Sequence, residues 1–259
     1  MRAVAASYLF FLVAWPVSLV AKETLSGGLG ELQGILGDPD VVQALRLTVL
    51  VAVVSVVANT VFGVGISLLL VRYEFPGKRA LSALLNLPLS VSPIVVGLAL
   101  TLAYGGRGGW FGPALEDAGL QIIFAWPGIV LATVFVALPL VIREVVPVLE
   151  EIGIEQEQAA RSLGANAVQT FRRITLPAIK WAVVYGVVLS LARSMGEFGA
   201  VKVVSGNVLG STRTATLVVE EKYLNFDQGG AYATAFLLAL VSVACIIVVS
   251  IIRPKEGHS

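Results

Sequence analysis

Six long runs of the sequence are apolar and almost free of charge, and they constrain the fold more than any other feature. Each is close to the ~20 residues that cross the hydrocarbon core of a bilayer as a helix. A chain inside that core must satisfy its own backbone hydrogen bonds, and these runs lack the alternating polarity of barrel strands. We therefore predict an all-α integral membrane protein, a single transmembrane domain over 1–259. The six predicted transmembrane helices are 3–21, 47–71, 80–104, 122–142, 181–201 and 231–252.

The composition agrees with a membrane protein and excludes several functions. The chain is 57% hydrophobic and 14% charged, whereas soluble domains have about 45–50% and about 25%. Its net charge of +1 provides no basic field for nucleic acid. With one cysteine (Cys245) and one histidine (His258), it has no means to build a metal cage or a Ser–His–Asp site. No Walker-type GxxxxGK[ST] loop occurs, so we expect no catalytic residue, metal or cofactor in this chain.

The basic residues indicate the orientation. Six spans place 11 Lys and Arg on the side that holds both termini and 6 on the other. By the positive-inside rule, both termini and the loop 143–180 are predicted to be cytoplasmic. The first run resembles a signal peptide, but Leu19 stands where cleavage after Ala21 requires a small residue, so we expect a retained helix. In the external loop 22–46 we expect a short helix from Asp40.

The predicted cytoplasmic loop 143–180 does not read as a linker. Residues 155–163 favour a helix with acids at its start and Arg161 near its end, which suits the helix dipole. Gly164 is placed to end that helix, 165–173 favours a second one, and Pro177 allows a fresh turn into the next span. We call residues 155–177 the hook. Its apolar side chains either pack on the protein's own loops or dock into a cleft on a cytoplasmic partner.

Two features lie inside the predicted membrane region. Arg193 and Glu197 are four residues apart and should share a helix face, either as an ion pair that fixes the span or in the translocation path. In the span 80–104, Pro88 and Pro93 flank Ser90 and Ser92. Prolines bend a span and free a carbonyl. Either this is a fixed kink or the broken helix lines a gate, and we favour the gate with Ser90, Ser92 and Pro93 in the path.

The hook carries a resemblance. Gln158-Ala159-Ala160-x3-Gly164-x9-Ile174-x-Leu176-Pro177 resembles the EAA motif of ABC-importer permeases, E-A-A-x3-G-x9-I-x-L-P, at every spacing. One departure is Gln158 at the first position, with Glu157 directly before it. The stretches 87–97, 138–151 and 181–206 are similar to sulfate permeases, and the last of them to the W-type subunit. The element Gly196-Glu197-Phe198-Gly199-Ala200 is shared with molybdate and tungstate permeases.

The resemblance implies a MetI-like permease fold with a cytoplasmic coupling hook. Such a permease works with a cytoplasmic ABC ATPase dimer that binds ATP and Mg²⁺, a second permease (here of the T type) and an external sulfate-binding protein. The expected function is transport of sulfate or thiosulfate; import of molybdate or tungstate by a permease homodimer is the alternative. A passive channel would not need the hook, and an integral-membrane enzyme would need more polar groups at one depth. The ATPase-coupling residues implied are Glu157, Gln158, Ala159, Ala160, Gly164, Ile174, Leu176 and Pro177.

Overall fold

The structure is a computed structural model that describes residues 7–8, 10–26 and 28–251, and every regular element in that part of the chain is a helix. This confirms the all-α prediction. Four helices are long and apolar enough to cross a membrane: α4 (Pro39–Arg72), α8 (Trp126–Glu151), the run Ala167–Met195, and Gln228–Val249 within α14 (Gln228–Ile251). A bent pair of helices, α5 (Lys78–Ser90) and α6 (Pro93–Tyr104), makes a fifth if it is counted as one span.

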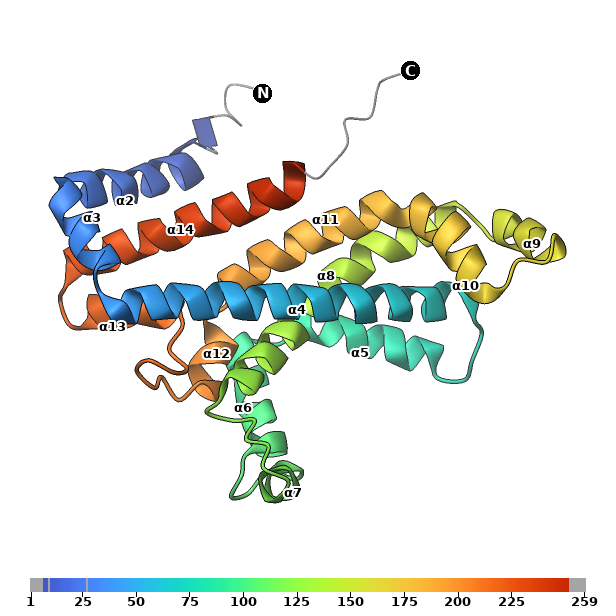
Figure 1. The fold of residues 1–259 in the computed structure, drawn as a ribbon, viewed down its shortest axis with the longest axis horizontal. Coiled ribbons are helices and arrows are strands. Elements are labelled where there is room, and N and C mark those ends of the chain that lie inside the picture. Colours follow the sequence, from blue (N-terminus) through green and yellow to red (C-terminus); the bar gives the residue numbers. More distant parts are fainter. Residues whose placement is uncertain (1–6, 9, 27, 252–259) are drawn as a thin grey trace.

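The sixth predicted span, 3–21, lies only partly in the described residues. A π turn, η1 (Phe10–Ala14), leads into α2 (Trp15–Ser26), which packs along α14. Residues 3–6 and 9 lie outside the described part, as do Arg2, Arg253, Lys255 and His258. The short helix α3 (Gly28–Leu36) then joins α2 to α4 (Figure 1). The count of six spans is therefore not reached within the described residues.

Helix α4 runs unbroken for 34 residues. Asp38 caps its start, where Oδ1 accepts the backbone N–H of Asp40 at 3.0 Å, and Pro39 occupies the first turn, where its missing N–H costs nothing. A helix does begin next to Asp40, as predicted, but it is not short, because no turn-forming residue lies between Asp40 and the apolar run. The helix instead continues directly into the predicted span 47–71.

The predicted span 80–104 is broken. α5 and α6 meet at an angle of 117° across the two residues Val91 and Ser92. Both have extended ψ angles near 140°, and for Ser92 this is the conformation that the following Pro93 imposes. Pro93 opens α6, whereas Pro88 lies inside α5 without ending it. The prolines thus predicted a break, although the sequence did not show which of the two makes it.

The predicted span 181–201 has different ends. α11 (Leu176–Met195) continues a short helix α10 (Ala167–Thr170) and a π turn η2 (Phe171–Thr175), so residues 167–195 form one rod of 29 residues. Pro177 therefore starts no fresh turn, because the wide π turn before it accommodates the missing N–H. At the other end the helix stops at Met195, and α12 (Gly199–Val204) begins after a three-residue break.

Helices α4, α8 and α11 form the centre of the molecule, and α14 packs on α11 from outside (Figure 1). Small residues bring the central helices together: Gly63 on α4 and Gly186 on α11 both abut Val141 on α8. Buried Asn59 donates to Ser190 Oγ at 3.3 Å between α4 and α11. Such small-residue contacts and polar pairs are what hold helices together in lipid.

We expect Gly186→Ala to destabilise the protein by about 1–3 kcal/mol, because the new methyl would lie 2.9 Å from the backbone Cα of Val141, which has no room to move. Gly65→Ala is the matched control. It lies in α4 with open space around the new Cβ and should stabilise by about 0.5–1 kcal/mol through helix propensity. The midpoint of thermal unfolding in detergent measures both, and equal midpoints would contradict the close packing at Val141.

Candidate functional site

The hook lies at the end of α4 that is far from α13 (Ala215–Leu224) (Figure 1). It consists of α9 (Glu155–Ser162), a turn, and α10. Gly164 in the turn has φ +89°, a left-handed conformation that favours glycine, so its predicted role as the end of the helix is confirmed. The second helix starts at residue 167 rather than 165, where Asn166 and Gln169 form a capping box.

An ion pair inside the protein ties the hook to α4. Arg72, at the last position of α4, lies 3.2 Å from Glu157 Oε1 and also donates to the carbonyls of Leu149 (3.1 Å) and Gly153 (2.8 Å). Thr175 Oγ1 donates to the same carboxylate oxygen at 2.9 Å. The pair is largely buried. Glu157 therefore points into the protein and positions the hook, whereas the sequence placed it among the residues that face the ATPase.

Two apolar side chains of the hook lie exposed on its surface, among polar and charged ones. Leu163 is 89% exposed and Val168 65% exposed. Gln158, Ala159, Gly164, Leu176 and Pro177 also lie on the surface, and Ala160 and Ile174 are half-buried. Phe171, by contrast, packs against the buried cluster around Leu149 and Ile179. All seven motif residues are thus at or near the surface, whereas Glu157, directly before the motif, is buried.

The second predicted group of residues lies where the two broken helices meet. α6 and α12 pack against each other. A Cβ on Gly97 would come within 2.8 Å of the Ala200 carbonyl, and one on Gly199 within 3.0 Å of Pro93 Cβ. Pro93 is therefore part of this contact, while Ser90 and Ser92 at the bend are exposed. The helices approach so closely because both positions lack a side chain.

Arg193 and Glu197 form the predicted ion pair, with Nη1 and Oε2 at 2.6 Å. Four-residue spacing on one helix does not fully explain this pair, because Glu197 lies outside α11, in the break that follows it. Its other oxygen accepts the N–H of Ala200 at 3.0 Å in the first turn of α12, and its carbonyl accepts from Thr216. The Glu197 side chain is 2% exposed and that of Arg193 36%. The pair thus holds the break together.

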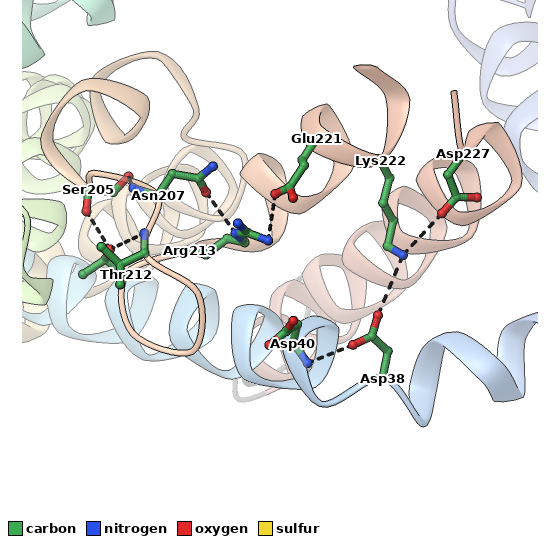
Figure 2. Close-up of polar contacts among 10 residues, drawn as sticks. Asp38, Asp40, Ser205, Asn207, Thr212, Arg213, Glu221, Lys222 and Asp227 are labelled. Carbon is green, nitrogen blue, oxygen red and sulfur yellow. Dashed lines mark hydrogen bonds and ion pairs between the residues drawn. The ribbon is translucent and has the colours of Figure 1, made fainter. Parts of the chain in front are cut away.

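A polar network that the sequence did not reveal fixes the loop between α12 and α13 (Figure 2). Arg213 donates to Asn207 Oδ1 at 3.1 Å and pairs with Glu221 at 2.7 Å. Lys222 lies between Asp38 and Asp227, so the network reaches the start of α4 (Figure 2). The spacing of these residues in the sequence follows no regular pattern from which their contacts could be predicted.

Three further hydrogen bonds fix this loop. Thr212 Oγ1 donates to the Ser205 carbonyl at 2.6 Å and accepts the N–H of Val208 at 3.1 Å. Ala215 N–H donates to Thr48 Oγ1 on α4 at 2.9 Å. The start of α13, which begins at Ala215, is thereby held against α4. Over the described residues, no group of three or more His, Cys, Asp or Glu side chains is arranged to hold a metal ion.

The comparisons identify relatives along nearly the whole chain. The family model "Binding-protein-dependent transport system inner membrane component" matches residues 59–257. The "Sulfate transport system permease protein CysW" of Synechococcus elongatus is 47% identical over 97% of this chain and 87% of the relative. The CysW protein of Escherichia coli K12 is 42% identical over 94% of this chain and 83% of its own. The CysT protein of Salmonella typhimurium is 34% identical over 94% of this chain and 87% of the relative.

A solved structure shares the fold. One chain of a bacterial alginate ABC transporter, crystallised with its alginate-bound periplasmic protein, superposes with a TM-score of 0.81. The superposition covers 96% of this chain and 91% of that one. At 14% sequence identity the likeness concerns the fold alone. It supports the overall arrangement of helices described above.

We expect the two charges of the interior pair to respond unequally to mutation. Arg193→Ala strands a carboxylate that is almost fully buried and should cost about 3 kcal/mol. Glu197→Gln keeps an acceptor for Ala200 and leaves Arg193 partly in contact with water, so it should cost about 1 kcal/mol. The double variant should recover part of the loss. Unfolding midpoints of the three variants form a double-mutant cycle, and strictly additive losses would show that the charges do not stabilise each other.

Proposed function

The chain belongs to the family of binding-protein-dependent transport system inner membrane components, and we propose that it is a permease subunit of an ATP-driven sulfate importer. The observation that carries this proposal is the high identity to CysW sulfate permeases over almost the whole chain. The identity to CysT permeases is lower. We therefore assign this chain to the W type and infer a T-type permease as its partner in a heterodimer.

The alternative cargo to sulfate is molybdate or tungstate. The element 196–200 is common to sulfate, molybdate and tungstate permeases in the resemblance described above, so it does not select among these dianions. Thiosulfate has a similar shape and charge to sulfate and belongs to the same proposal. Selection among them rests on an external sulfate-binding protein, because Arg193 is neutralised by Glu197 and offers no free charge to an anion.

The hook is the proposed docking element for the ATPase. Leu163 and Val168 present an apolar surface at the far end of α4, and apolar side chains of a short helix commonly fill a groove on a partner. The 11 to 6 distribution of basic residues supports a cytoplasmic position for the hook and both termini. ATP and Mg²⁺ then bind on the partner ATPase dimer, since this chain has no Walker-type loop.

The rod 167–195 gives a physical route for coupling. At one end the bond from Thr175 to Glu157 joins the rod to α9 of the hook, and at the other Glu197 joins it to α12. A helix of 29 residues is about 43 Å long and stiff enough to move as a unit. We infer that movement of the docked hook is transmitted to the break, where α6 and α12 meet.

The direct test of the proposed function uses the complete importer in proteoliposomes: both permeases, the ATPases and the binding protein. We expect the sulfate-loaded binding protein to stimulate ATP hydrolysis and sulfate uptake, and molybdate to give neither. Stimulation by molybdate alone would overturn the sulfate assignment. Uptake without the ATPases would overturn the importer and support a passive channel.

A charge introduced into the hook should prevent the ATPase from binding to the permease. Leu163→Asp or Gly164→Asp should leave the permease folded in the membrane but release the ATPase, because each introduces a charge into an apolar contact. A Cβ at Gly164 meets nothing within 4 Å, but its φ of +89° strains any side chain there, so Leu163→Asp is the cleaner of the two changes. Affinity capture of the ATPase by the tagged permease is the measurement.

Two controls separate docking from folding. Gly164→Asn tolerates the same left-handed turn without a charge and should retain more ATPase than Gly164→Asp. Val208→Asp changes an exposed valine at the opposite end of the molecule and should retain all of it. Full capture with Leu163→Asp would mean that the hook does not dock the ATPase.

A further inference from the structure

Helix α5 carries a polar stripe that needs a partner. Arg79, Ser82, Asn86 and Ser90 follow each other at spacings of three, four and four residues, so they lie along one face. No residue of α5 is buried within this chain, and the helix packs mainly on α8. A stripe of this kind is costly against lipid and is typical of a helix that borders a water-filled path.

An arginine from α8 joins this stripe at a cavity. Arg143 Nη2 donates to Asn86 Oδ1 at 3.2 Å, and Asn86 Nδ2 in turn donates to the Ser82 carbonyl at 2.8 Å. The cavity between α4, α5 and α8 has a volume of about 230 Å³ and is lined by Ser82, Asn86 and Arg143 together with apolar residues such as Leu70 and the prolines 139 and 147. It has room for about seven water molecules, which also suffices for a tetrahedral oxyanion.

The charge of Arg143 is not neutralised. Within the part of the chain that the structure describes, Arg143 makes no ion pair with a carboxylate. Asn86 engages a single N–H of the five that a guanidinium carries. The remaining donors are available to an oxyanion, for which the planar guanidinium is well suited. This distinguishes Arg143 from Arg193, whose charge Glu197 compensates.

The cavity also leads toward a basic surface. A second hollow, lined by Glu74, Phe75, Gly77, Lys78, Arg79 and Ser82, shares Ser82 with the first. Lys78 is paired with Glu74, but Arg79 makes no ion pair within the described residues. Arg143 on α8, which contacts Asn86, and Arg79 on α5 thus follow one another toward the loop 72–79, which the basic residues predict to be cytoplasmic.

We propose that the cavity at Arg143, Asn86 and Ser82 is an anion-binding station on the translocation path, where a tetrahedral dianion pauses before it leaves on the hook side. Arg143 binds the anion directly. Asn86 is a positioning residue, because it holds the guanidinium over the cavity while leaving its charge free. The proposal rests on the proposed function, since it assumes that the cargo is a dianion that passes through this permease.

The test measures sulfate uptake and binding-protein-stimulated ATP hydrolysis in the complete importer, per assembled complex. Arg143→Ala should lower uptake roughly tenfold, because a charge-assisted hydrogen bond to the cargo is lost, while ATP hydrolysis persists. Arg143→Lys should retain most of the uptake. Arg46→Ala is the matched control: it removes an exposed arginine of α4 outside this cavity and should transport normally.

Asn86→Asp distinguishes an anion station from a structural contact. The change is nearly isosteric and places a carboxylate beside Arg143, so a merely structural contact would become stronger and uptake would stay normal. If Arg143 receives the anion, the new carboxylate occupies it, and uptake should fall as in Arg143→Ala with normal assembly. Full uptake by Arg143→Ala or by Asn86→Asp would overturn the station. So would an equal loss of assembled complex in Arg143→Ala and Arg143→Lys.

The same experiment separates this proposal from the proposed function. If the unmodified importer carries molybdate and not sulfate, the sulfate assignment fails, and the variants are compared by molybdate uptake with the same expectations. If the unmodified importer carries neither dianion, the proposed function and the station both fail. Normal sulfate transport that is unaffected by the Arg143 and Asn86 changes overturns the station alone.

Discussion

The absence of water in the bilayer core is the constraint on which this structure depends. A helix that breaks inside the membrane exposes backbone groups, and these must be covered by protein or reach a water-filled path. Here the span made by α5 and α6 is broken, and α11 ends three residues before the short helix α12. Helices α6 and α12 pack on each other through Gly97 and Gly199, so each covers the other. Without side chains at these two glycines, the breaks can be brought together and shielded.

Glu197 has its place in this arrangement for two reasons. It accepts a hydrogen bond from the N–H of Ala200, one of the donors that the start of α12 leaves free, and it compensates the charge of Arg193 at the end of α11. A neutral side chain could do the first and not the second. The carboxylate therefore joins the two helices across the break. At the other end of α12, the Phe124 N–H donates a hydrogen bond to the Val204 carbonyl at 2.8 Å.

The sequence predicted the elements better than their ends. Hydropathy located the long helices, and Gly164 marked the end of α9, because both signals act locally. The ends of the span 181–201 were wrong, since a π turn absorbs Pro177 and three residues after Met195 break the helix. The inward position of Glu157 was missed because Arg72, its partner, is 85 residues away in the chain. The contact between Arg143 and Asn86 was missed for the same reason. Contacts of this kind require the fold and have no signature in spacing.

Four arginines, Arg72, Arg143, Arg193 and Arg213, show that the same residue type can have two different roles in this protein. Arg72 pairs with Glu157 and donates to two backbone carbonyls, which holds the hook at one end of α4. Arg213 pairs with Glu221 and donates to Asn207, which holds the α12–α13 loop. Arg193 fastens the break between them. In these three cases an acid cancels the charge, and what remains is a directional link between elements. Arg143 is held by a neutral amide instead, which fixes its position without cancelling its charge. A permease for an anion requires both kinds of site: compensated charges that hold broken helices in place, and an uncompensated one that the cargo itself can pair with for a short time.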